Sequence, residues 1–188
     1  RITHLIDATH PFAAQMSANA VEAAARAGIP LAALTRPPWR PGQGDDWRCV
    51  PDVAAAVAAL DGPARRVMLA LGRQTLAAFA ALPLPRHHYL LRLAEPPDRP
   101  PLPDCEIIVA RGPFDVAGDT ALLRDRRIEV IVCKNAGGTG AAAKLCAARA
   151  LGLPVIMIDR PALPARTEIT TVAGIFDWLG HTGADLGV

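Results

Sequence analysis

Basic side chains recur at the ends of the predicted strands of this sequence, where each short apolar run gives way to a loop. Five such ends carry arginine or lysine and a sixth carries histidine: His10, Arg36, Arg73, Arg111, Lys134 and Arg160. Ligands of parallel sheets bind outside the carboxyl ends of the strands, so binding groups are expected at these positions. The formal net charge of the whole chain is only +2. The pattern therefore predicts a local site for an anionic ligand, since arginine and lysine bind carboxylates and phosphates.

The glycine-rich segment Lys134–Gly140 lies between an apolar strand and an alanine-rich helix that is expected to begin at Thr139. Gly137 and Gly138 allow the backbone to approach a ligand closely, and a helix N-terminus favours negative charge. The lysine precedes the glycines, so the segment matches neither a Walker loop nor the GxGxxG pattern. We interpret it as a phosphate or carboxylate contact, with an ordinary strand-to-helix turn as the alternative. Lys144, in the first turns of that helix, points either to the same ligand or into solvent, and solvent is the simpler expectation.

A second candidate element is Thr9-His10-Pro11, which follows the first predicted strand. Pro11 fits the first position of a helix with His10 at its cap, which would leave backbone N–H groups free for an anion. His10 titrates near neutral pH and could also donate a proton, although a cap without chemistry is the alternative. Asp7 is expected to hold this turn rather than to act in catalysis. Trp39 either covers a flat ligand or packs against its own loop.

Short apolar strands alternate with helical segments along the sequence. Strands are expected at 2–7, 31–34, 47–50, 67–71, 88–91, 106–110, 128–133 and 155–158. Helices are expected at 11–27, 52–60, 74–82, 115–126, 139–151 and 172–179. This alternation predicts an α/β protein with two Rossmann-like, doubly wound domains, whose parallel sheets are covered by helices on both faces. We expect the boundary near Gly62, with residues 1–61 as the remainder of an N-terminal domain and residues 62–188 as a C-terminal domain.

Composition limits the function classes that need to be considered. The chain is 51% hydrophobic and 20% charged, which indicates a globular fold, and its small net charge argues against a nucleic-acid partner. Four cysteines without a CxxC pair are expected to be reduced thiols in a cytoplasm. We expect neither a membrane span nor a signal peptide, because no apolar run is long enough and no charged-then-apolar leader precedes the first strand. GxSxG, HExxH and ligand-spaced His/Cys sets are absent from the sequence, so no metal site is predicted and a cofactor is expected to supply the chemistry.

Five segments, in this order and spacing, carry a resemblance to a known family: Asp7–Ala13, Arg36–Trp39, Arg111–Phe114, Lys134–Gly138 and Arg160–Pro161. They are similar to the precorrin-6A reductases of cobalamin biosynthesis, over essentially the whole chain. The resemblance implies an NADPH-dependent enzyme, without metal or flavin, that reduces one carbon–carbon double bond of precorrin-6A to give precorrin-6B. It also implies two Rossmann-like domains with the ligands in the cleft between them. Members of the family begin with a further strand and a Gly-Gly-Thr turn that contacts the cofactor, so we expect part of the cofactor site to lie upstream of Arg1.

With this resemblance the candidate residues become two sets of expected contacts. The cofactor set is Thr9, His10, Pro11, Arg36, Gly72, Arg73, Lys134 and Asn135. The substrate set is Arg111, Gly112, Gly137, Gly138, Lys144 and Arg160. Both ligands are polyanions, because NADPH carries phosphates and the substrate carries acetate and propionate groups, so both need cations. His10 is in addition the candidate donor of the proton that accompanies the hydride.

Two other functions stay open on the sequence alone. A non-catalytic two-domain module that binds an anionic small molecule or nucleotide would carry the same cations at its strand ends. A nucleotide-sugar or phosphoryl transferase would need a pair of metal-binding carboxylates or a clear base near the glycine-rich segment, and Asp159 alone does not meet that need. The sequence also leaves open whether the substrate contains cobalt and whether the protein forms oligomers.

Overall fold

The computed structural model describes residues 2–80 and 87–181, and the chain divides into two compact units. Unit 1 consists of Arg1–Pro38 and Pro161–Val188, and unit 2 consists of Trp39–Arg160. The chain therefore crosses twice between the units. This division differs from the boundary expected near Gly62, because the strand at 47–50 pairs with a strand of unit 2.

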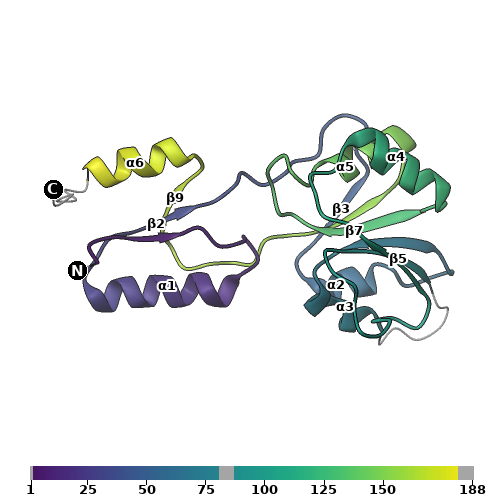
Figure 1. The fold of residues 1–188 in the computed structure, drawn as a ribbon, viewed down its shortest axis with the longest axis horizontal. Coiled ribbons are helices and arrows are strands. Elements are labelled where there is room, and N and C mark those ends of the chain that lie inside the picture. The colour runs from purple at the N-terminus through teal and green to yellow at the C-terminus, as the bar shows by residue number, and fades with distance from the viewer. Residues whose placement is uncertain (1, 81–86, 182–188) are drawn as a thin grey trace. The chain divides into compact units, whose positions relative to one another are not determined.

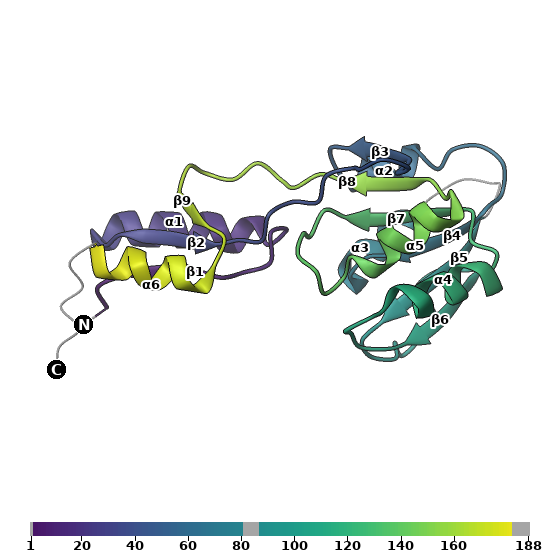
Figure 2. The same cartoon turned by 90° about the horizontal axis from the view of Figure 1, so that it is seen from above.

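The sheet of unit 2 has six parallel strands in the order β3-β8-β7-β4-β5-β6 (Figures 1 and 2). Their bounds are Trp47–Val50 (β3), Arg66–Ala70 (β4), His88–Leu93 (β5), Cys105–Val109 (β6), Val130–Lys134 (β7) and Val155–Ile158 (β8). The interior strands β7 and β8 are almost continuous apolar runs, as expected for strands that are covered on both faces. The predicted parallel α/β architecture is confirmed.

Four helices cover this sheet, with α4 and α5 on one face and α2 and α3 on the other (Figure 1). Their bounds are Val53–Ala58 (α2), Arg73–Ala80 (α3), Val116–Asp125 (α4) and Ala143–Leu151 (α5). The side chains of Met68, Ile131 and Met157 have no exposed surface. Burial of each such side chain contributes roughly 1.5–3 kcal/mol, so the sheet is a stable base for the residues at its edge. The end of the helix expected at 74–82 lies outside the described residues.

The strand order places the ends of β4 and β7 at a topological switch point. From β4 the chain proceeds outward through β5 to β6, and it then returns to β7 on the other side of β4. Loops that leave the two central strands of such a sheet separate from each other and form a crevice for ligands. The strand β3 lies at the sheet edge next to β8, with Trp47 opposite Val155. The ligand site is therefore expected beside β4 and β7.

Unit 1 has a three-stranded parallel sheet in the order β1-β2-β9, with one helix on each face (Figure 1). The elements are β1 (Leu5–Asp7), α1 (Ala14–Ala27), β2 (Leu31–Leu34), β9 (Thr167–Ile169) and α6 (Val172–His181). The helix α1 ends as predicted at Gly28, whose φ of 63° is left-handed. The strand β9 was not predicted, because three residues with two polar side chains give no strand signal until they pair with β2.

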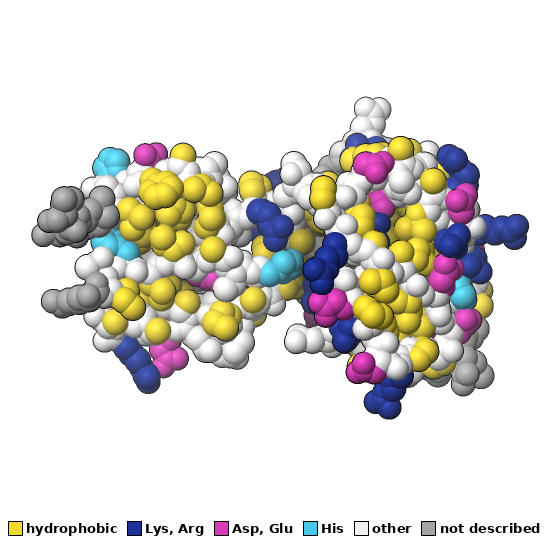
Figure 3. Space-filling model, in the orientation of Figure 1, with side chains coloured by type: hydrophobic (Ala, Val, Ile, Leu, Met, Phe, Trp, Pro, Cys, Tyr) yellow, Lys and Arg dark blue, Asp and Glu magenta, His cyan; other side chains and the backbone are white. Residues whose placement is uncertain are grey.

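The two units differ in how they bury apolar side chains. All of the largest fully buried side chains that the structure describes belong to unit 2. Unit 1 leaves Ile2, Met16, Val172 and Phe176 between 57% and 73% exposed. Figure 3 shows hydrophobic side chains over the face of unit 1 that is drawn, and interspersed basic and acidic side chains over unit 2. In the described ranges, no helix combines the length and the apolar character that a membrane span requires.

Candidate functional site

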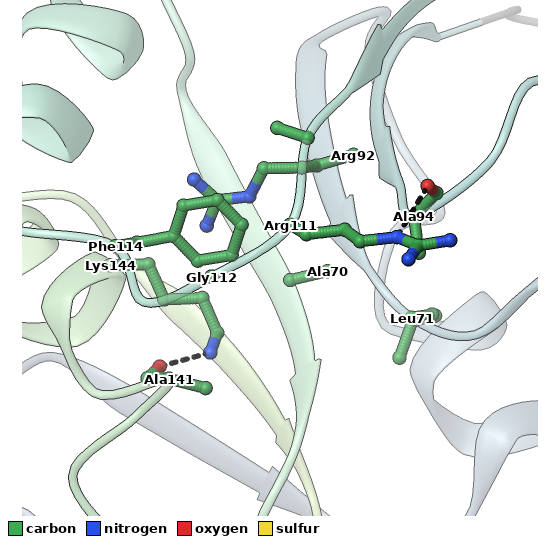
Figure 4. Close-up of a pocket in the computed structure, with 10 residues that line it drawn as sticks. Ala70, Leu71, Arg92, Ala94, Arg111, Gly112, Phe114, Ala141 and Lys144 are labelled. Carbon is green, nitrogen blue, oxygen red and sulfur yellow. Dashed lines mark hydrogen bonds between the residues drawn. The ribbon is translucent and has the colours of Figure 1, made fainter.

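A pocket of about 350 Å³ lies in unit 2 at the carboxyl ends of the strands (Figure 4). It is lined by Ala70, Leu71, Arg92, Ala94, Ala110, Arg111, Gly112, Phe114, Ala141 and Lys144. These residues come from the ends of β4, β5 and β6 and from the region where α5 begins. Three of the side chains are cationic, and none of the described residues that line the pocket is acidic. The pocket thus combines apolar walls with positive charge, which suits an anionic ligand with an apolar body.

Arg92 is held in place by two neighbours. Its guanidinium forms a bidentate ion pair with Asp119 of α4, in which Nη2 lies 3.3 Å from Oδ2. The ring of Phe114 lies over the guanidinium, with its centroid 3.7 Å from Cζ (Figure 4). The side chains of Arg92 and Asp119 are only 10% and 4% exposed. Asp119 therefore balances the charge of Arg92, and the charge available to a ligand comes mainly from Arg111 and Lys144.

Arg111 is the exposed cation of the pocket. Its Nη2 donates to Oε1 of Glu95 at 2.8 Å, and its Nε donates to the carbonyl of Ala94 at 3.3 Å. The side chains of Arg111 and Glu95 are 70% and 69% exposed. Such an exposed ion pair contributes about 0–1 kcal/mol, so a carboxylate of a ligand can replace Glu95 at little cost.

Lys144 is buried, and the expectation that it points into solvent was wrong. Only 5% of the residue is exposed, because the first turn of α5 faces the sheet and also buries Ala143 and Leu145. Its Nζ donates to the carbonyl of Ala141 at 2.5 Å (Figure 4) and lies 4.9 Å from the ring centroid of Trp39. Burial lowers the pKa of the ammonium group, because the charged form loses hydration. The structure thus brings Lys144 to the same pocket as Arg111.

The glycine-rich segment leaves β7 as a loop and does not run directly into a helix. The helix α5 begins at Ala143, not at Thr139 as predicted, and its cap residue Ala142 makes no side-chain hydrogen bond. Gly137 and Gly138 have φ values of 69° and 76°, a left-handed conformation that glycine adopts without strain. The backbone N–H groups of residues 137–140 have no acceptor among the residues that the structure describes. These N–H groups are therefore available to an anion, although they belong to a loop and not to the helix end.

Two side chains that were expected to contact ligands hold this loop in shape. The Oδ1 of Asn135 accepts the N–H of Trp39 at 2.8 Å, and its Nδ2 donates to the carbonyl of Trp39 at 3.1 Å. Arg160 donates from Nε to the carbonyl of Asn135 at 2.9 Å and from Nη2 to the carbonyl of Ala136 at 3.2 Å. The carbonyls of Asn135 and Ala136 are therefore bound inside the protein, while the N–H groups of residues 137–140 have no acceptor among the described residues.

Residues around the start of α3 adjoin the pocket. Gly72 and Arg73 line a second hollow, of about 400 Å³, that shares part of its wall with the main pocket. A guanidinium nitrogen of Arg73 donates to the carbonyl of Glu95 at 3.3 Å. At the end of β7, Nζ of Lys134 donates to Oγ1 of Thr75 at 3.0 Å, and burial lowers the pKa of this lysine. The expected cofactor contacts of unit 2 thus lie at the carboxyl ends of the strands, as the expected substrate contacts do.

In unit 1, Asp7 accepts four hydrogen bonds. Its Oδ1 accepts the N–H of Thr9 at 3.0 Å and the hydroxyl of Thr9 at 2.6 Å. Its Oδ2 accepts the hydroxyl of Ser17 and Nη1 of Arg166, each at 2.6 Å. Burial raises the pKa of Asp7, but the bonds from Ser17 and Thr9 and the charge of Arg166 outweigh this effect and lower it overall. The expectation that Asp7 holds the turn is confirmed.

His10 and Pro11 precede α1 and do not cap it. The helix begins at Ala14, with Ala13 as its cap residue. The carbonyl of His10 accepts the N–H of Ala13 at 2.7 Å, and Nδ1 of His10 accepts the N–H of Phe12 at 3.2 Å. The prediction of a cap with free N–H groups was wrong, because a tight turn before the helix uses those groups. The imidazole of His10 itself is exposed.

The expected contacts fall into two groups, one in each unit. Thr9, His10, Pro11 and Arg36 belong to unit 1, and all others belong to unit 2. Asp119 was missed because a single carboxylate inside a predicted helix gives no sign of the arginine that it meets.

The four cysteines are free thiols. In the part of the chain that the structure describes, no group of three or more His, Cys, Asp or Glu residues is arranged to hold a metal ion.

Known proteins resemble this chain closely. The family model for "Precorrin-6x reductase CbiJ/CobK" matches residues 1–180. The precorrin-6A reductase of Rhodobacter capsulatus is 59% identical over 184 residues, which are 97% of this chain and 72% of that protein. The precorrin-6A reductase of Rhodococcus erythropolis is 49% identical over 177 residues, with 94% and 71% covered. The cobalt-precorrin-6A reductase of Priestia megaterium is 32% identical over 189 residues, with 94% and 71% covered.

One solved structure, named "CobK precorrin-6A reductase", superimposes on this fold with a TM-score of 0.93. It is 59% identical in sequence, and the match covers 97% of this chain and 75% of that chain.

Proposed function

Since the chain belongs to the precorrin-6x reductase family CbiJ/CobK, we propose that it is an NADPH-dependent oxidoreductase that converts precorrin-6A into precorrin-6B in cobalamin biosynthesis. The reaction reduces one carbon–carbon double bond of the macrocycle. The pocket of unit 2 carries the proposal, because three cationic side chains and apolar walls meet at the ends of the strands. A tetrapyrrole with acetate and propionate groups offers the complementary features, an apolar ring and several carboxylates.

The substrate contacts are assigned to Arg111, Gly112, Lys144 and the glycines Gly137 and Gly138. Arg111 can exchange its exposed partner Glu95 for a carboxylate of the substrate. Lys144 adds a charge that forms no ion pair within the described residues, and the loop adds unbonded N–H groups. Arg160 contributes by fixing two loop carbonyls. Carboxylates held at several points fix the orientation of the ring, which is what hydride transfer to one particular carbon requires.

The metal-free form of the substrate is favoured over the cobalt form. The relatives at 59% and 49% identity are named for precorrin-6A, whereas the relatives named for cobalt-precorrin-6A are 32% and 31% identical. A comparison of kcat/KM for the two substrates tests this preference. A higher value with the cobalt form would contradict it.

The cofactor contacts are assigned to Thr9, His10, Pro11 and Arg36 of unit 1 and to the sheet edge of unit 2 that carries Gly72, Arg73, Lys134 and Asn135. The donors there suit a phosphate-bearing cofactor, because they include guanidinium groups, an ammonium group and backbone N–H groups. When bound, NADPH supplies the hydride. The free thiols agree with a reducing, cytoplasmic compartment.

The proton for the second carbon is assigned to His10. Because Nδ1 accepts the N–H of Phe12, the neutral ring carries its proton on Nε2. The ring is exposed and can exchange that proton with water between turnovers. His10→Ala should therefore lower kcat much more than the affinity for NADPH. An unchanged kcat would remove His10 from the mechanism and leave water as the donor.

Turnover tests the proposal directly. The chain is mixed with precorrin-6A and NADPH, and the absorbance of NADPH and of the macrocycle is followed. Consumption of both in equal amounts supports the proposal, and equal rates with NADH would contradict the assignment of NADPH. Tight binding of both ligands without turnover would instead support a non-catalytic binding module, which shares the same cations.

A further inference from the structure

Trp39 makes three hydrogen bonds to the glycine-rich loop, although it lies about a hundred residues away in the sequence. Its backbone N–H and carbonyl are both bound by the side-chain amide of Asn135, at 2.8 Å and 3.1 Å. Its indole Nε1 donates to the carbonyl of Gly138 at 2.7 Å. Packing alone would require none of these bonds, so the indole is placed by polar contacts as well as by its ring.

The same indole also meets the buried cation of the pocket. The Nζ of Lys144 lies 4.9 Å from the centroid of the Trp39 ring, within the range of a cation–π contact. Lys144 lines the pocket, and its own hydrogen bond runs to the carbonyl of Ala141. The side chain of Trp39 therefore contacts two groups to which the proposed function assigns the binding of substrate carboxylates. One is the glycine-rich loop, and the other is the ammonium group of Lys144.

We propose that Trp39 is a positioning residue for substrate binding, an inference that rests on the function proposed above. Its indole N–H holds the carbonyl of Gly138 inside the protein, and the adjoining N–H groups of the loop are left for carboxylates. Its ring supports Lys144 beside the pocket. Arg160 holds the carbonyls of Asn135 and Ala136 in the same way. Together, Trp39 and Arg160 bind three of the four carbonyls from residue 135 to residue 138, and the exception is that of Gly137.

The chain offers a matched control for this inference. Trp47 is also partly buried and packs against the same hydrophobic core as Trp39. The Nε1 of Trp47 is buried and makes no hydrogen bond to the glycine-rich loop within the described residues, and the polar group that it influences is Asp45, whose pKa it helps to lower. Trp→Phe at either position removes one indole N–H and a similar amount of apolar surface. Only at Trp39 does this replacement also remove a hydrogen bond to the loop.

Steady-state kinetics with NADPH and precorrin-6A tests the inference with Trp39→Phe and Trp47→Phe. Loss of one hydrogen bond that preorganises the loop should raise KM for precorrin-6A by about three- to tenfold in Trp39→Phe. The kcat at saturating substrate should stay within about twofold of wild type, because the reacting groups are unchanged. Trp47→Phe should leave both constants unchanged. The inference is overturned if the two variants raise KM equally, or if Trp39→Phe lowers kcat and leaves KM unchanged.

A second measurement separates this inference from the proposed function. Calorimetric titration with uroporphyrin, a tetrapyrrole that carries acetate and propionate groups, reads carboxylate binding without turnover. If wild type binds uroporphyrin but does not reduce precorrin-6A, the proposed function fails, and the weaker binding expected only in Trp39→Phe still decides the inference. Hydrogen exchange of peptides that cover 135–142 should be faster in Trp39→Phe than in Trp47→Phe. Equal exchange and equal affinity in the two variants would show that the indole N–H of Trp39 does not position the loop.

Discussion

Replacement of Asp7 by asparagine should destabilise unit 1 by about 3–5 kcal/mol. The side chains of Arg166 and Asp7 are only 6% and 2% exposed, and the carboxylate accepts hydrogen bonds from both Arg166 and Ser17 on Oδ2. Asparagine has nearly the same shape, but it must present its NH2 group to the donors on one side. The guanidinium also loses its buried counter-charge and keeps only the exposed carboxylate of Glu168, whose Oε1 lies 3.4 Å from Nε.

Arg166→Met should cost less, about 1.5–3 kcal/mol, which corresponds to one hydrogen bond to a charged group. In that variant Asp7 keeps its two bonds from Thr9 and its bond from Ser17. Asp7→Asn should lower the stability more than Arg166→Met because Asp7 is the acceptor of all four bonds. Thr9→Val and Ser17→Ala remove single donors and should also cost less than Asp7→Asn.

The stability difference between wild type and Asp7→Asn should depend on pH in a fixed direction. The native pKa of Asp7 lies below its ordinary value of 3.8, so the native state favours the charged carboxylate. The resulting stabilisation is fully present above pH 3.8 and is lost as the pH falls through the native pKa. The advantage of wild type should thus be constant from neutral pH down to about pH 4 and shrink below it.

Urea titration combined with hydrogen exchange measures these differences within unit 1. Peptides that cover 5–34 and 167–181 report the free energy of opening of this unit, and peptides of unit 2 serve as the control. The reasoning is refuted if Arg166→Met costs as much as Asp7→Asn. It is also refuted if the advantage of wild type already declines between about pH 7 and about pH 5, because a lowered pKa does not allow that.

Three further predictions concern unit 2. Asp119→Asn should destabilise it by about 3–5 kcal/mol in urea unfolding, because Arg92 loses its buried counter-charge, and a cost below about 1 kcal/mol would contradict the ion pair. Gly137→Ala should cost about 1–2 kcal/mol of unfolding free energy, because φ of Gly137 is 69°. Gly140→Ala should be close to neutral, because Gly140 has no positive φ and no atom lies within 4 Å of the added Cβ. Equal costs of the two variants would contradict the loop geometry. The free energy of unfolding of wild type should rise relative to that of Lys144→Met as the pH increases toward 10.5. The reason is that the native pKa of Lys144 is lowered, so the unfolded state binds more protons than the native state. A fall in this difference in free energy would contradict the burial of Lys144.

Local patterns in the sequence were sufficient for most of the elements. The apolar runs of β7 and β8 and the glycine that ends α1 act over a few residues, so each was predicted close to its observed place. The predicted helix starts were wrong at His10-Pro11 and at Thr139, where a turn or loop lies before the first helical residue. A helix can begin at several adjacent residues with similar local energy, and the packing of its first turn selects one of them.

By itself the sequence determined the parallel α/β architecture, the basic residues that follow the strands and the glycines that need a left-handed backbone, because these depend on the order of residues along the chain. Only the tertiary structure decided which cations a ligand can use. Asp119 balances Arg92, Asn135 and Arg160 hold the loop, and Lys144 lies buried beside Trp39. The tertiary structure also decided that β3 joins the sheet of unit 2 and that β9 joins the sheet of unit 1. Such partners are far apart in sequence, so their contacts arise from the three-dimensional packing and leave no local pattern in the chain.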